Sequence, residues 1–92
     1  MKAKDKKAIA ALNEQIVALQ AREKLIEKEW DDIWESGDRD LYNAKVNQLG
    51  PEWDGIDPKI AELRDQIRRI KDQDLYDKGY YHELSLARAN ID

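Results

Sequence analysis

Apolar residues recur at alternating spacings of three and four through the first third of the chain, and this pattern constrains the fold more than any other feature. The series has eight members, and all except Glu23 are apolar. They are Ile9, Leu12, Ile16, Leu19, Glu23, Ile26, Trp30 and Ile33. A repeat of 3.5 residues places these side chains along one narrow stripe of a helix, which is the pattern by which helices pair. We therefore expect a long helix that another helix covers.

The sequence after this stripe contains signals that divide it into shorter segments. Gly37 is a suitable C-terminal cap for the long helix. Asp38 is a suitable N-terminal cap for a short helix, which Gly50-Pro51 would end. We expect residues 52–56 to form a loop that carries Trp53.

A second series of apolar residues follows Asp57-Pro58, an acidic N-cap with proline at the first helical position. Its members are Ile60, Leu63, Ile67 and Ile70. We expect a single all-α domain, a long helical hairpin like an antiparallel coiled coil, with one or two short additional helices. The expected segments are a basic flexible tail at 1–7, a long helix at 8–36, a short helix at 38–50, a second long helix at 57–78 and a short C-terminal helix at 80–91.

The two long helices expected from these signals differ in length, with about four heptads in the first and about two and a half in the second. Part of the first stripe would then have no partner in its own chain. We expect this part to mediate a homodimer, through Ile9, Leu12, Ile16 and Leu19; the alternatives are that the shorter helices or a foreign protein cover it. A structural coiled-coil homodimer that serves assembly is therefore one alternative for the function.

Glu23 occupies a stripe position that usually holds an aliphatic side chain. Because an unpaired carboxylate is costly to bury, we expect Glu23 to be exposed to water or paired with an arginine of the second helix. The candidate arginines are Arg64, Arg68 and Arg69. The alternative is a polar residue that sets the register of a coiled-coil dimer.

Charge and tryptophan are concentrated in the same part of the sequence. Residues 1–7 have a net charge of +3, residues 27–40 a net charge of −5, and residues 58–71 again +3. Tryptophan side chains often dominate binding energy, and carboxylates attract basic surfaces. We expect a partner-binding surface made of Trp30, Asp31, Asp32, Trp34, Glu35, Asp38, Asp40 and Trp53. The alternatives are an acidic face that only maintains solubility and, for Trp30, a ring that closes the hairpin.

Catalytic chemistry lacks the residues that it usually requires. The chain has no cysteine and only one histidine, His82, so the common zinc sites and Cys/His nucleophiles are absent. Asp38-Arg39-Asp40 and Asp72-Gln73-Asp74 resemble the opening of a calcium loop, but the glycine and the acid required later in that loop are missing. We expect no catalytic, cofactor or metal site, and therefore no enzyme.

Composition also bears on partners and location. The net charge of −4 and the interrupted basic residues of the second helix disfavour direct nucleic-acid binding, although a nucleic-acid-binding accessory protein is a second alternative. No segment approaches the roughly 18–20 apolar residues of a membrane span. The lack of cysteine is typical of a reducing compartment, so we expect a cytoplasmic protein without membrane contact.

In general character the chain resembles the small, acidic, cysteine-free helical accessory proteins of bacteriophages and mobile elements. The resemblance implies a non-enzymatic inhibitor that binds a host protein. Together with the acidic segment, it favours a partner whose basic, nucleic-acid-binding surface the chain would block.

Overall fold

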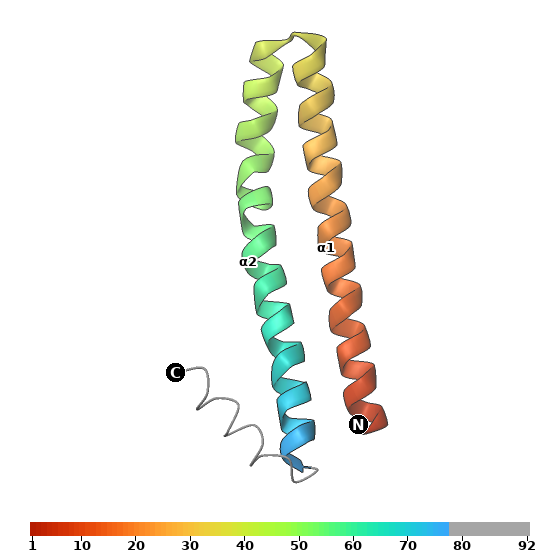
Figure 1. The fold of residues 1–92 in the computed structure, drawn as a ribbon. Coiled ribbons are helices and arrows are strands. Elements are labelled where there is room, and N and C mark those ends of the chain that lie inside the picture. Colours follow the sequence, from red (N-terminus) through yellow and green to blue (C-terminus); the bar gives the residue numbers. More distant parts are fainter. Residues whose placement is uncertain (78–92) are drawn as a thin grey trace, which may run out of the picture.

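The computed structural model describes residues 1–77, which form two long helices packed side by side in an antiparallel hairpin (Figure 1). Helix α1 spans Ala3–Ser36 and helix α2 spans Arg39–Asp77. The predicted all-α helical hairpin is therefore confirmed. The short C-terminal helix predicted at 80–91 lies outside the described residues. Within those residues, neither helix has a stretch both long and apolar enough to cross a membrane.

Helix α1 begins earlier than the sequence signals indicated. It starts at Ala3, and the N–H groups of Asp5 and Lys6 both donate to the carbonyl of Lys2 at 3.1 Å. The predicted flexible tail at 1–7 is thus wrong from Ala3 onward. Alanine and lysine have high helix propensities, and a carboxylate in the first turn, here Asp5, favours the helix N-terminus.

Gly37 and Asp38 form the two helix caps that the sequence indicated, and together they make the turn between the long helices. Gly37 adopts φ 81°, the left-handed region, and its N–H donates to the carbonyl of Trp34 at 3.1 Å. The carboxylate of Asp38 accepts a hydrogen bond from the N–H of Leu41 at 3.0 Å. A glycine cap followed directly by an aspartate cap reverses the chain between the ends of α1 and α2.

Helix α2 is continuous through the segment that the sequence signals divided. Gly50-Pro51 does not end a helix, residues 52–56 are not a loop, and Asp57-Pro58 does not begin a new helix, because all of them lie inside α2. The separate helices predicted at 38–50 and 57–78 are therefore one helix. Trp53 lies within it.

The two prolines are tolerated because of where they lie on α2. Proline inside a helix costs about 3 kcal/mol, partly because it provides no N–H for the carbonyl four residues earlier. Pro51 and Pro58 are both exposed, as are Asn47 and Asp54, whose carbonyls lose that donor. Water can hydrate these carbonyls, so the local cost is reduced.

Packing on the opposite side of α2 supplies the compensating stability. Leu49, Trp53, Ile56 and Ile60 continue the spacing of four, three and four through both prolines. Ile56 and Ile60 are buried in the core, and Leu49 and Trp53 pack against it. Burying one large apolar side chain contributes about 1.5–3 kcal/mol, so the uninterrupted stripe outweighs the local proline signals.

The core lies along the line where the two helices meet, and both helices contribute to it. Its buried members are Ile16 and Ile26 from α1 and Ile56, Ile60, Leu63 and Ile67 from α2. Ile26 and Leu63 are almost completely buried, with 0% and 2% of their surface exposed.

The two helices are similar in length, with 34 residues in α1 and 39 in α2. The expected excess of the first helix is therefore absent. Ile16 is buried within the hairpin, and Ile9, Leu12 and Leu19 pack against the same core. The prediction of a homodimer through these four residues assumed that they have no partner within the chain. In the structure they pack against the core shared with α2 instead.

Candidate protein-binding tip

The closed end of the hairpin, which we call the tip, comprises residues 31–42. It contains the last turn of α1, the turn at Gly37 and the first residues of α2 (Figure 1). Six of the eight predicted partner-binding residues lie here and are exposed: Asp31, Asp32, Trp34, Glu35, Asp38 and Asp40. The turn therefore brings together most of the surface that the sequence indicated.

Trp34 is the largest exposed side chain of the tip. Its surface is 49% exposed, yet two neighbours from α2 orient its ring. Tyr42 meets it edge-on, with ring centroids 5.0 Å apart and planes at 65°. The guanidinium carbon of Arg39 lies 4.1 Å from the ring centroid. Edge-on aromatic pairs and cations over tryptophan are both favourable, so Trp34 is held in place while one side remains open.

Sequence reasoning missed three residues of the tip. Arg39 and Tyr42 contact Trp34, and Leu41 is 43% exposed between them in the sequence. Their relation to Trp34 depends on the path of the turn. The pairing of Gly37 with the Asp38 cap was the available signal, because it brings the start of α2 back over the end of α1.

The tip carries a concentrated negative charge. It contains five carboxylates and one basic residue, Arg39, so its net charge is −4. None of these carboxylates forms an ion pair within the described residues. Asp38 uses one oxygen to cap α2. The tip is therefore an acidic surface that its own chain does not neutralise.

Trp30 and Trp53 lie inside the hairpin, away from the turn. Their rings are 5.8 Å apart at an angle of 51°, and both pack partly buried against the core. The indole N–H of Trp30 donates to the backbone carbonyl of Lys45 at 3.3 Å. Trp30 therefore packs between the two helices, which agrees with its alternative interpretation as a ring inside the hairpin, and Trp53 is a residue of α2 rather than of a loop.

Two ion pairs between the helices lie next to the tryptophans. Arg22 binds Glu52 through two contacts, Nε to Oε2 at 2.6 Å and Nη2 to Oε1 at 3.1 Å. These hydrogen bonds lower the pKa of Glu52 and raise that of Arg22. In the second pair, Nζ of Lys45 lies 3.5 Å from Oε1 of Glu29. Exposed pairs of this kind contribute little stability.

Glu23 has a different neighbour from the expected arginines. It faces Asp57, and hydrogen bonding to that carboxyl, then burial and repulsion, raise the pKa of Glu23. Arg68 and Arg69 both bind Asp65 on their own helix. Among the described residues, Oε2 of Glu23 and Nε1 of Trp53 are buried polar atoms with no hydrogen-bond partner. Two incompletely paired polar side chains therefore interrupt the apolar core near the middle of the hairpin.

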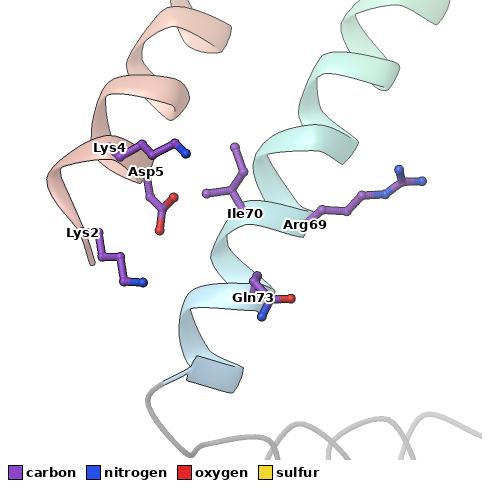
Figure 2. Close-up of a pocket in the computed structure, with 6 residues that line it drawn as sticks. All are labelled: Lys2, Lys4, Asp5, Arg69, Ile70 and Gln73. Carbon is purple, nitrogen blue, oxygen red and sulfur yellow. The ribbon is translucent and has the colours of Figure 1, made fainter.

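The open end of the hairpin has the opposite charge character. A shallow hollow there is lined by Lys2, Lys4, Asp5, Arg69, Ile70 and Gln73 (Figure 2). Arg69 points away from α1 and binds Asp65 at 2.9 Å. No group of histidine, aspartate and glutamate side chains within residues 1–77 is arranged to hold a metal ion.

Comparison with known proteins identifies no relative. No protein-family model matches the chain, and no curated protein or solved structure matches it.

Proposed function

We propose that this chain is a non-enzymatic protein-binding module that uses the tip of its hairpin to bind a basic surface of another protein. The observation that carries the proposal is Trp34, a half-exposed tryptophan held in place by Tyr42 and Arg39 among carboxylates that no ion pair of the described residues neutralises. An oriented aromatic anchor surrounded by charge is the composition of an interface hot spot and its rim.

The charge of the tip favours a basic partner. Five carboxylates lie within residues 31–40, and a nucleic-acid backbone likewise concentrates negative charge, which proteins bind with lysine and arginine. We therefore propose that the partner surface is one that binds nucleic acid, and that the chain acts as an inhibitor by occupying it. Duplex DNA should then compete with the chain for the partner.

The first experiment compares matched baits in a pull-down from a cell lysate. Trp34→Ala removes the anchor at the tip, and Leu75→Ala removes an exposed apolar side chain near the opposite end of the hairpin. The supporting result is a protein retained by wild type and Leu75→Ala but lost with Trp34→Ala. A protein retained equally by all three baits would contradict the tip as the binding surface.

Binding kinetics with the captured protein then separate the anchor from the charges. Loss of a hot-spot ring should raise the dissociation rate by at least about tenfold, the equivalent of roughly 1.4 kcal/mol. Reversing Asp31 and Asp32 to lysine should instead slow association and flatten its salt dependence. The matched control reverses Asp54 and Glu62, two exposed carboxylates outside the tip. Equal association rates for both double variants at low salt would show that the tip charges only solubilise the chain.

A further inference from the structure

The side of α1 that faces away from α2 carries two large apolar side chains. Val17 is 63% exposed and Leu25 is 60% exposed. Ala21 lies midway between them, four residues from each, so the three side chains form one continuous ridge on the helix surface. The other face of α1 is already covered by α2, whereas no described residue buries this ridge.

Charged residues flank the ridge in a specific order. The outer face of α1 contains a series of residues spaced by seven: Lys7, Glu14, Ala21, Lys28 and Glu35. Glu14 and Lys28 are each seven residues from Ala21, on opposite sides of it, and Lys7 and Glu35 are each fourteen residues from it. Glu14 and Lys28 are exposed, and neither forms an ion pair within residues 1–77. The face is therefore complementary to itself when one copy is reversed.

Charge over the whole hairpin has the same polarity. Residues 20–57, which form the half nearer the tip, contain eleven carboxylates and five basic residues, a net charge of −6. The remaining described residues, 1–19 and 58–77, contain nine basic residues and seven carboxylates, a net charge of +2. Antiparallel copies place opposite charges side by side, whereas parallel copies place like charges together.

We propose that two copies of this chain pair antiparallel through the outer face of α1, about a two-fold axis at Ala21. Val17 then lies level with Leu25 of the partner subunit, and Glu14 lies opposite Lys28 of the partner subunit. Helices packed in this way cross at about 20°, so they diverge toward their ends and leave Trp34 uncovered. This dimer uses neither the core stripe nor Trp34, and it does not depend on the proposed function.

A charge-swap series tests the pairing by sedimentation velocity. The interface is small, so the measurement extends from about 10 μM to about 1 mM protein. Glu14→Lys and Lys28→Glu should each weaken the wild-type dimer by about tenfold or more, because each creates two like-charge contacts. The double variant Glu14→Lys/Lys28→Glu exchanges the charges and should recover wild-type affinity. Circular dichroism checks that each variant is folded.

Disulfide cross-linking tests the orientation, since the chain contains no cysteine of its own. A disulfide requires Cα atoms within about 7 Å. An oxidised mixture of Val17→Cys and Leu25→Cys should give the mixed dimer, and each variant alone should stay largely uncross-linked. Cross-linking of each variant with itself would indicate a parallel pair and overturn the proposal. So would a wild-type chain that stays monomeric throughout, or a double variant that fails to recover affinity.

Discussion

Glu23 on α1 faces Asp57 on α2, so two carboxyl groups meet across the middle of the hairpin. The pKa of Glu23 is raised from its ordinary value of 4.5 by hydrogen bonding to Asp57, by burial and by repulsion from Asp57 and Glu27. The folded hairpin therefore binds a proton at Glu23 more tightly than the unfolded chain does. Stability from this proton is fully present below pH 4.5 and is lost as the pH rises through the raised pKa.

Replacement of Glu23 by glutamine should raise the melting temperature at pH 7, because the amide removes the charge repulsion from Asp57. The difference from wild type should shrink as the pH falls toward 4.5, where wild-type Glu23 gains its proton. Thermal unfolding followed by circular dichroism between pH 4 and pH 7 measures this convergence. Glu35→Gln, at an exposed carboxylate remote from Asp57, is the control. A constant difference across the pH range would exclude the Glu23–Asp57 interaction as its cause.

Two glycine substitutions should have opposite effects on stability. Gly37→Ala places a Cβ at φ 81° and should destabilise the hairpin by about 1–2 kcal/mol. Gly55 lies inside α2 without a positive φ, and a Cβ there would meet no atom within 4 Å. Gly55→Ala should therefore stabilise the protein by about 1 kcal/mol. Urea unfolding gives both values, and a loss of stability in Gly55→Ala would contradict the continuous helix.

Replacing either proline of α2 with alanine should also stabilise the hairpin. Alanine restores an N–H donor inside the helix, a gain of up to about 3 kcal/mol. The unfolded chain becomes more flexible at the same time, which removes about 0.4–1 kcal/mol of that gain. Pro51→Ala and Pro58→Ala should each be more stable than wild type in urea. If a helix truly began at Pro58, its replacement would produce no such gain.

Core truncations should be far more damaging than truncations on the outer face. Leu63→Ala and Ile26→Ala remove almost fully buried side chains and should each cost about 2–5 kcal/mol. Native domains are stable by only about 5–15 kcal/mol, so one such variant brings this small hairpin close to unfolding. Val17→Ala, at an exposed position, should change stability by about 0.5 kcal/mol or less. Measurements at low protein concentration keep self-association from affecting the comparison.

Sequence reasoning succeeded where the signal was local or strictly periodic. The stripe from Ile9 to Ile33 predicted a long helix, and Gly37 and Asp38 predicted where that helix ends and the next one begins. It failed where a local signal opposed a periodic one. Pro51 and Pro58 suggested helix boundaries, although Leu49, Trp53, Ile56 and Ile60 continued the apolar stripe through both. Reading those four positions as one series would have predicted the continuous α2.

The positions of the tryptophans show the same division. All three lie in or near the acidic part of the sequence, but only Trp34 belongs to the exposed tip. Trp30 and Trp53 pack against each other because the register of the helices brings them together across the hairpin. Spacing along one helix assigns a face to each ring, and the register between helices decides what that face meets.

The sequence by itself determined that this chain forms paired helices, where the first helix ends, and that its charge is segregated along its length. These properties follow from periodicity and local capping, which neighbouring residues specify. Only the tertiary structure decided that α2 runs through two prolines, that Glu23 meets Asp57, and that Trp34 stands open at the tip. Those outcomes depend on contacts between residues distant in the sequence, whose combined packing energy outweighs local preference.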